Sequence, residues 1–292
     1  MPGLGETIDS DDLEHRYLGK VIIFVEAPGD AAVLGMLIGP GYDERIEFKS
    51  FAEAKGSVAT KDRVKEERQS NKKIFALLDG EAAVMEMGGF ARLLYCDTFI
   101  FSLGDPNLEG VLFLAEHELE NIILRQANVC HYIINDETLM GVGAKSRDDV
   151  AAAITNTIER QFAAAVCKYA SIHLNREGKM AGAFKKAVWD DPTPSTMKTV
   201  KVRVVNAHKA HWPTFYAEVR ELKAAIKERF EPLDNDRRSD EMARLADGKT
   251  ALSWLAHSYK IDKKWLGHLM EQVTAMPYAD RLREEIFEAT GA

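Results

Sequence analysis

Cysteine is scarce in this chain of 292 residues and follows no recognisable spacing. The three cysteines, Cys96, Cys130 and Cys167, lie far apart, are odd in number and include no Cys-x-x-Cys pair. This pattern argues against the dense disulfide framework of small secreted domains and against a cysteine-based zinc site. We therefore expect three reduced cysteines that serve as packing residues in the interior.

Long apolar runs and an excess of positive charge are also missing. No apolar run is long enough to span a bilayer, and the first residues, through Asp12, are acidic where a signal peptide would be basic and then apolar. We expect a cytoplasmic protein with no membrane partner. The formal net charge of −8 argues against a protein that coats nucleic acid through charge alone, but it does not exclude a nuclease.

One segment does carry a local excess of positive charge. Between residues 176 and 209, eight Lys or Arg outnumber three acids. The candidate contacts to nucleic acid in this segment are Lys185, Lys186, Lys201, Arg203 and Lys209. An ordinary solvated loop region explains the same pattern equally well, because charge clusters alone are weak evidence.

Two apolar runs in the first part of the chain end abruptly in carboxylates. The run at 21–25 is followed by Glu26 and Asp30, and the run at 74–78 is followed by Asp79 and Glu81. Such runs are typical of strands buried on both faces of a parallel sheet, and ligands bind at the carboxyl ends of these strands. Convergent carboxylates suit a hard divalent cation, whereas stability alone gives no reason to cluster like charges. The first hypothesis is an enzyme that uses Mg²⁺, or alternatively Mn²⁺, to act on phosphates.

The first 130 residues alternate between strand-like and helix-like segments. Strands are expected at 21–25, 45–51, 73–78, 97–103 and 110–115, and helices at 31–38, 57–71 and 82–94. Asp30 is expected to be the N-cap of the first helix, and Gly88 and Gly89 weaken the third helix in its middle. This alternation predicts an α/β fold with a small parallel sheet flanked by helices.

The sequence changes to long helices beyond about residue 130. Ser146–Asp149 resembles a capping box, with Asp149 in the place of the usual Glu, and apolar residues then recur at helical spacing as far as Tyr169. Further helices are expected at 213–230, 251–259 and 262–275. We therefore divide the chain into an α/β catalytic domain, residues 1–130, and a mainly α-helical domain, residues 131–292.

Four short motifs in a fixed order resemble a known family. They are Phe24-Val-Glu-Ala-Pro-Gly-Asp30, Leu78-Asp-Gly-Glu81, Glu118-Leu-Glu-Asn121 and Asp247-Gly-Lys249. Their order and spacing resemble the TOPRIM-type nucleases related to the overcoming-lysogenization-defect (OLD) family. Within that group the chain is similar to the AriB-type effector subunits of the PARIS anti-phage defence systems. The resemblance covers about the first 125 residues well and the helical remainder loosely.

The resemblance implies roles for individual acids. Glu26 would bind metal or act as general base or acid, and Asp79 and Glu81 would hold Mg²⁺. Asp30 would support the same site or only start its helix. Residues two apart diverge by about 160° on a helix, so at most one of Glu118 and Glu120 reaches the metal if that segment is helical. Glu120 is favoured, with Glu118 as the alternative.

The resemblance also implies a function and partners. The chain would be a toxic, metal-dependent endonuclease that cleaves host transfer RNA, is held inactive by an ABC-type (AriA-like) ATPase subunit and is active as a homodimer. A DNA endonuclease of the OLD type is the alternative enzyme. Two departures from the family pattern, Ala27-Pro28 where a Gly is usual and Glu81 where an Asp is usual, leave open a third reading, a catalytically silent interaction module.

Three other features carry less weight. Gly141–Ser146 looks like a phosphate loop, but Ala144 replaces the required Gly, so a nucleotide site is rejected. His208 and His211 have no accompanying ligand cluster and are expected on the surface. Apolar residues at helical spacing are better explained as core than as partner contacts; they are Trp254, Leu255, Trp265 and Leu269.

Overall fold

The computed structural model describes residues 19–39, 44–50, 56–135, 146–179, 202, 204–206, 208–262 and 264–292. A five-stranded sheet has the order β2-β1-β3-β5-β4. Its strands are β1 (Val21–Val25), β2 (Ile46–Ser50), β3 (Ile74–Leu78), β4 (Ile100–Phe101) and β5 (Val111–Leu114). Strand β4 is antiparallel to β5, and all other neighbours are parallel. The predicted α/β class with a mostly parallel sheet is confirmed.

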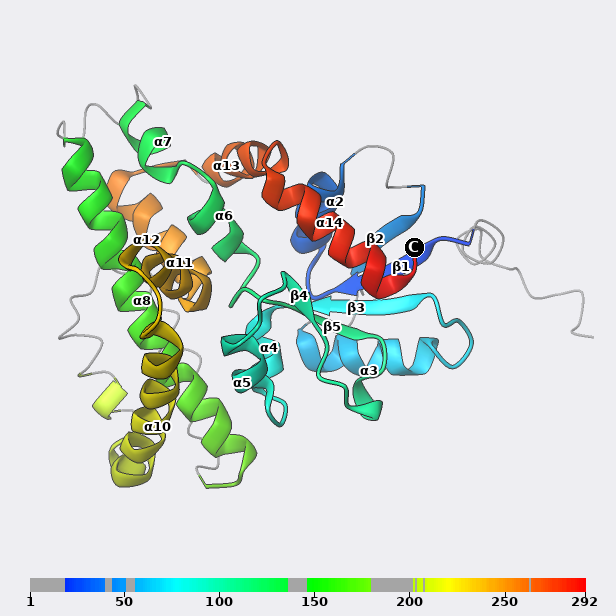
Figure 1. Ribbon diagram of the computed structural model, residues 1–292, viewed down its shortest axis with the longest axis horizontal. Helices are drawn as coiled ribbons and strands as arrows, with labels where there is room; N and C mark the ends of the chain where they lie inside the picture. Colours follow the sequence, from blue (N-terminus) through cyan, green and yellow to red (C-terminus); the bar gives the residue numbers. More distant parts are fainter. Residues whose placement is uncertain are drawn as a thin grey trace, which may run out of the picture.

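Helices surround the sheet and make up the C-terminal region, as predicted (Figure 1). Those that start within the first 130 residues are α2 (Pro28–Ile38), α3 (Ser57–Glu67), α4 (Gly80–Val84), α5 (Gly89–Leu94), η1 (Pro106–Leu108), α6 (Glu120–Gln126) and α7 (Val129–Asn135). The later ones are α8 (Arg147–Arg176), η4 (Lys209–His211), α10 (Trp212–Phe230), α11 (Asn235–Leu245), α12 (Gly248–Tyr259), α13 (Trp265–Thr274) and α14 (Pro277–Thr290). Among the helices of these described ranges, none combines the length and the apolar character needed to cross a membrane.

The sheet is buried on both faces, which explains the continuous apolar runs in its strands. Along β1, Ile23 faces one core together with Leu34 of α2 and Ile286 of α14. The neighbouring Ile22 faces the opposite core, which includes Val64 of α3 and extends to α8 and α10. Figure 1 shows α2, α13 and α14 over one face of the sheet and α3 over the other.

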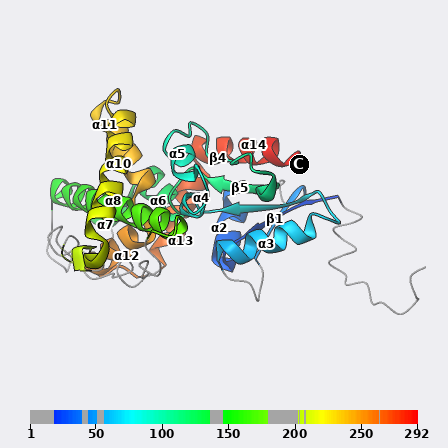
Figure 2. The ribbon, with the colours of Figure 1, turned by 90° about the horizontal axis from the view of Figure 1, so that it is seen from below.

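The long helix α8 organises the remaining helices. Helices α7, α10, α11 and α12 pack against it, and α4 joins it to the sheet (Figure 2). Ser146 begins α8 through a reciprocal capping box with Asp149, as the sequence predicts. The chain then returns through α13 and α14, which pack on α2, so the end of the chain lies beside the first strands.

Two predicted elements differ most from the structure, one because it is divided and one because it is much shorter. The helix expected at 82–94 is broken into α4 and α5, because Gly88 has φ of 73° and a side chain on Gly89 would lie 1.7 Å from the Ala83 carbonyl oxygen. The strand expected at 97–103 shrinks to β4, because the backbone N–H groups of Phe99 and Ile100 donate to the Glu285 carboxylate of α14. The three cysteines are unpaired, as expected, but only Cys96 among them is buried as predicted, whereas Cys130 and Cys167 are half-buried.

Candidate functional site

The acids that follow the central strands meet at one edge of the sheet. Strand β3 lies between β1 and β5, and the three run parallel, so their carboxyl ends are adjacent. Glu26 follows β1, Asp79 follows β3, and Glu118 lies just beyond β5. The edge at which parallel α/β sheets bind ligands is therefore lined with carboxylates.

The turn after β3, which carries Asp79 and Glu81, is held against the segment Glu116–His117 by backbone hydrogen bonds. The backbone N–H of Gly80 donates to the Glu116 carbonyl at 2.9 Å, and that of Glu81 donates to the His117 carbonyl at 3.0 Å. A side chain on Gly80 would lie 2.2 Å from the Glu116 carbonyl oxygen, so this close approach requires glycine. Asp79 Oδ1 then accepts the backbone N–H of Leu119 at 3.1 Å.

Lys249 lies at the centre of the first group of acids. Its ammonium is 3.6 Å from Asp79 Oδ2, 3.9 Å from Glu118 Oε1 and 3.7 Å from Glu120 Oε2. Its backbone N–H donates to Glu118 Oε2 at 2.9 Å. Both Glu118 and Glu120 thus reach the same cation. The expectation that at most one of them reaches a metal ion applies to a helical segment, and α6 begins at Glu120, after Glu118.

Asn121 and Gly248 explain how Lys249 reaches this position. The Asn121 amide donates to the carbonyls of Ala243 and Ala246, at 2.6 and 2.8 Å, and its oxygen accepts the Glu118 N–H at 2.9 Å. A side chain on Gly248 would lie 2.5 Å from that amide oxygen. The Glu-Leu-Glu-Asn and Asp-Gly-Lys motifs, far apart in the sequence, are therefore in direct contact.

A second group of polar side chains surrounds Glu81. Lys168, in the second half of α8, contacts Glu81 Oε2 with its ammonium, which also lies 3.9 Å from Asp247 Oδ2. His117 Nε2 is 3.5 Å from the same Glu81 oxygen. Sequence reasoning missed Lys168 and His117 as site residues. The available signal for Lys168 was a lysine inside the otherwise apolar stretch around Tyr169.

His117 is held from both sides. Its backbone N–H donates to the Arg244 carbonyl at 2.8 Å, and its Nδ1 contacts the hydroxyl of Tyr169. The ligand atoms of Glu81, His117 and Glu118 all lie within 4.8 Å of one another. These three side chains could hold a metal ion.

Burial governs the ionisation of the site. Burial raises the pKa of Glu26, Asp30 and Glu120, and raises that of Asp79 and Glu118 well above the ordinary values; Lys249 opposes each of these shifts. For Lys249 itself, burial lowers the pKa, but the surrounding acids outweigh burial and raise it.

Acids outnumber cations in the two groups together. The acids are Glu26, Asp30, Asp79, Glu81, Glu118, Glu120 and Asp247, and the cations are Lys168 and Lys249. Buried carboxylates without enough partners are costly, so the excess acids favour the binding of a further cation.

The site is open to solvent on two sides. One cavity, of about 370 Å³, is lined by Glu26 and Glu81 together with the basic residues Lys168 and Arg176. A second, of about 680 Å³, is lined by Glu120 and Lys249 and extends to Lys260. A metal ion or a phosphate can therefore reach both groups of acids.

Asp30 joins the site in a different way from the expected one. The predicted N-cap role is wrong, because α2 begins at Pro28 with Ala27 as its N-cap, which places Asp30 within the first turn. Proline suits the first helical position because it has no N–H to satisfy there. Asp30 interacts with Lys249, which lowers its pKa against the effect of burial.

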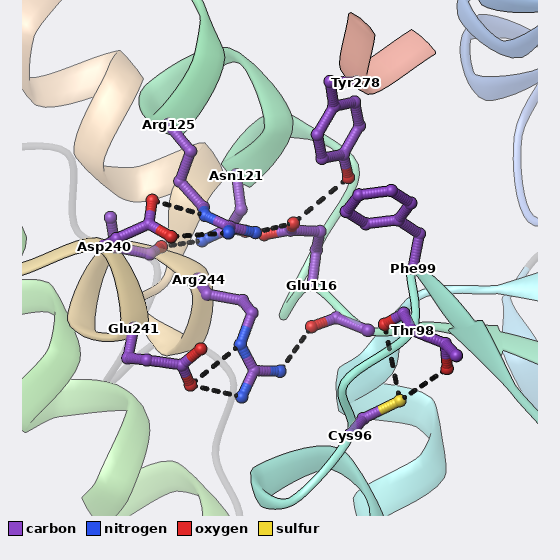
Figure 3. Close-up of polar contacts among 12 residues, drawn as sticks. Cys96, Thr98, Phe99, Glu116, Asn121, Arg125, Asp240, Glu241, Arg244 and Tyr278 are labelled. Carbon is purple, nitrogen blue, oxygen red and sulfur yellow. Dashed lines mark hydrogen bonds and ion pairs between the residues drawn. The ribbon is translucent and has the colours of Figure 1, made fainter. Parts of the chain in front are cut away.

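An ion-pair network around the buried Glu116 supports the backbone of the site (Figure 3). Arg125 of α6 contacts Glu116 and binds Asp240 of α11 through two hydrogen bonds of 2.9 and 2.7 Å. Tyr278 of α14 donates to Glu116 at 3.2 Å. In the same view, Arg244 donates to the Ala115 carbonyl at 2.5 Å. Helices α6, α11 and α14 are thus tied to the segment that carries His117 and Glu118.

The structure tests few of the predicted basic contacts. Lys185, Lys186, Lys201 and Arg203 lie outside the described residues, as does the rejected phosphate-loop segment through Lys145. Lys209 is exposed in η4.

Two other expectations can be checked directly. The surface position expected for His208 is wrong, because it is buried and bonded to Ser171 at 2.6 Å. Leu255, Trp265 and Leu269 are core residues, as expected, and Trp254 is partly buried against the same core.

Comparisons with models of protein families, with curated proteins and with solved structures find no significant match for this chain. The functional argument therefore depends on the site itself.

Proposed function

We propose that this protein is a metal-dependent nuclease that cleaves RNA. The observation that supports this most is the convergence of Glu26, Asp79 and Glu81, with Glu118 and Glu120, at the carboxyl edge of a parallel sheet. Acids in this arrangement, open to solvent and short of cations, suit metal-assisted chemistry on a phosphate.

The residues of the site fit a hard divalent cation. Glu120 Oε2 is buried and has no hydrogen-bond partner within the described part of the chain, although the Lys249 ammonium is 3.7 Å away. Asp79 and Glu81, with Glu120 and Asp30 beside them, would hold Mg²⁺ or Mn²⁺ through oxygen ligands, which leaves the Glu26 carboxylate free for proton transfer. A bound cation of this kind polarises the scissile phosphate and lowers the pKa of a coordinated water.

Glu26 is suited to the proton transfer. It lies in the cavity beside Glu81, and burial and the Glu81 charge raise its pKa toward the range in which a carboxylate exchanges protons efficiently near neutral pH. Glu26 would take the proton from the attacking water, or from a 2′-hydroxyl if the cleavage proceeds by transesterification. Arg176 and Lys168 line the same cavity and would attract the phosphate backbone.

The substrate, partners and setting follow from the motif resemblance together with this site. We propose that the substrate is transfer RNA and that the protein is a cytoplasmic toxic effector in anti-phage defence. An ABC-type ATPase subunit would hold it inactive, and the active form would be a homodimer. A single acidic site with few basic residues around it offers little surface for a structured RNA, which favours a dimer.

A second candidate function is favoured by the two lysines. Lys168 and Lys249 already neutralise part of the acidic charge, as they would in a silent TOPRIM-type module that uses the cluster only for structure or for binding a partner. Such a module would bind its partner without any cleavage of nucleic acid.

Incubation of the purified protein with total RNA and with plasmid DNA tests the proposal. We expect RNA fragments with Mg²⁺ or Mn²⁺ and none with EDTA. Plasmid cleavage alone would favour a DNA endonuclease of the OLD type. No cleavage of either, together with no toxicity on expression with or without a neighbouring ATPase gene, would favour the silent module.

A further inference from the structure

His117 is a fully buried histidine whose outer nitrogen is directed at the acids of the site. Its Nε2 has no hydrogen-bond partner among the residues that the structure describes and lies 3.5 Å from Glu81 Oε2, too far for a hydrogen bond. Buried polar atoms are nearly always satisfied, so an unsatisfied one that points into a group of carboxylates indicates a missing ligand.

The contacts of Tyr169 favour the tautomer of His117 with its proton on Nδ1. The Leu245 carbonyl can only accept, so the Tyr169 hydroxyl donates its hydrogen there, at 3.4 Å. The hydroxyl oxygen is then the acceptor for His117 Nδ1–H. This leaves a lone pair on Nε2. A histidine that donates from one nitrogen to a neighbour and offers the other is the usual arrangement of a metal ligand.

Burial, and after it the nearby Lys168 ammonium, lower the pKa of His117 to about 3. The cation that contacts Glu81 is Lys168.

We infer that Glu81, His117 and Glu118 form a binding site for a divalent first-row transition metal, which they bind in preference to Mg²⁺. The inference rests on the proposed function and refines its metal site, because Glu81 belongs to both ligand sets while His117 and Glu118 are added to it. Two ligands about 2.1 Å from one metal are at most about 4.2 Å apart. The three ligand atoms lie within 4.8 Å of one another, so a small movement of the side chains completes the site.

The nitrogen ligand determines the preference. Mg²⁺ selects oxygen ligands, keeps several of its waters and gains little from an imidazole. Mn²⁺, Fe²⁺, Co²⁺ and Zn²⁺ accept mixed nitrogen and oxygen ligands, and their affinity for such a site rises in that order. Two of the remaining acids, Asp79 and Glu120, lie around Lys249 and offer oxygen ligands alone.

Lys168 competes with the metal for Glu81. Its ammonium contacts the carboxylate oxygen that faces His117, and Asp247 Oδ2, 3.9 Å away, offers it another partner. Metal entry would exchange the Lys168 contact of Glu81 for a metal bond and leave the ammonium beside Asp247. A neutral side chain in place of Lys168 should therefore strengthen metal binding.

Pulsed electron paramagnetic resonance of the protein with Mn²⁺ alone tests the nitrogen ligand directly. We expect ¹⁴N coupling from one imidazole in the wild type and in His268→Gln, a control at an exposed histidine, and loss of that coupling in His117→Gln. Absence of ¹⁴N coupling in the wild type, or its persistence in a folded His117→Gln, would overturn the inference.

Titration with Mn²⁺ and with Mg²⁺ supplies a second readout. We expect about tenfold or greater preference for Mn²⁺, about tenfold weaker Mn²⁺ binding in Tyr169→Phe, and tighter binding in Lys168→Met. Tyr169→Phe keeps the ring and serves if His117→Gln does not fold. Equal affinity for the two metals in the wild type contradicts the inference.

Neither measurement uses nucleic acid, so the two proposals fail separately. A protein that cleaves RNA with Mg²⁺ but shows no nitrogen ligand retains the proposed function and loses the inference. A protein with the nitrogen ligand and no cleavage does the reverse.

Discussion

The ammonium of Lys168, on the buried side of α8, contacts the carboxylate of Glu81 in the first turn of α4. The helical region thus supplies a side chain to the acidic edge of the sheet. Lys249 does the same from the start of α12. The candidate site is therefore built by both parts of the chain, and we expect the first 130 residues alone to have an incomplete site.

Substitution of Gly248 tests the contact that positions Lys249. In Gly248→Ala, the new methyl group would lie 2.5 Å from the Asn121 amide oxygen, so we expect a loss of about 1–3 kcal/mol in stability and weaker metal binding. The matched control is Gly267→Ala in α13, where nothing lies within 4 Å. Removing a helical glycine there should add about 0.5–1 kcal/mol. Chemical denaturation of both variants provides the comparison, and equal effects would count against the contact.

Removing Arg125 from its ion pair with the buried Glu116 should cause a large loss of stability. Arg125→Met would leave Glu116, which is 1% exposed, with the Tyr278 hydroxyl as its one hydrogen-bond partner among the described residues, at a cost of about 3 kcal/mol. The control Arg237→Met removes a pair in which both side chains are exposed and should change stability by less than about 0.5 kcal/mol.

A second change at the same place separates charge from packing. Adding Glu116→Gln to Arg125→Met removes the unpaired charge, so part of the lost stability should return. If urea denaturation shows no recovery in the double variant, the loss comes from packing and the electrostatic explanation is wrong.

The raised pKa of the site acids predicts how stability depends on pH. Burial raises the pKa of Asp79 well above its ordinary value of 3.8, so the folded protein binds this proton more tightly than the unfolded chain does. Its contribution to stability is complete below pH 3.8 and is lost as the pH rises through the folded-state pKa. Glu118 behaves in the same way.

Thermal unfolding in EDTA measures this effect. We expect the melting temperature to fall as the pH rises from about 5 to about 8. The fall should be smaller in Asp79→Asn, and smaller with Mn²⁺ present, because the cation stabilises the ionised carboxylates. A melting temperature that rises over this range in EDTA would contradict the assignment of the shifts.

Much of the sheet could be predicted because local sequence determines it. The runs that form β1 and β3 are apolar throughout, since both faces are buried, and the acids after them mark the ligand-binding edge. The strand that became β4 was predicted, but its short length was not, since that length depends on Glu285 of α14, whose carboxylate accepts the backbone N–H groups of Phe99 and Ile100. The burial of His208 was also unexpected, because it depends on a contact with Ser171 of α8, a residue far away in the sequence.

The acids of the site were visible in the sequence, but their cations and the histidine were not. Asp79 and Glu81 stand out because they follow the apolar run of β3. Lys168 lies within the long helix α8, and the sequence does not show which segments pack against that helix. His117 lies between two glutamates, and its role depends on Tyr169, which α8 brings to it. Asp30 was predicted to be the N-cap, but α2 begins at Pro28. The sequence did not reveal this start because the N-cap, Ala27, has no capping side chain.

The most direct test of the central claim is the rate of RNA cleavage by Glu26→Gln, measured with Mg²⁺ and with Mn²⁺. The wild type and Glu159→Gln, a change at an exposed position of α8, serve as references. We expect cleavage to fall by about a hundredfold or more in Glu26→Gln, with no fall in melting temperature, and to be unaffected in Glu159→Gln. Metal-dependent cleavage at the wild-type rate in a folded Glu26→Gln would contradict the assignment of this site.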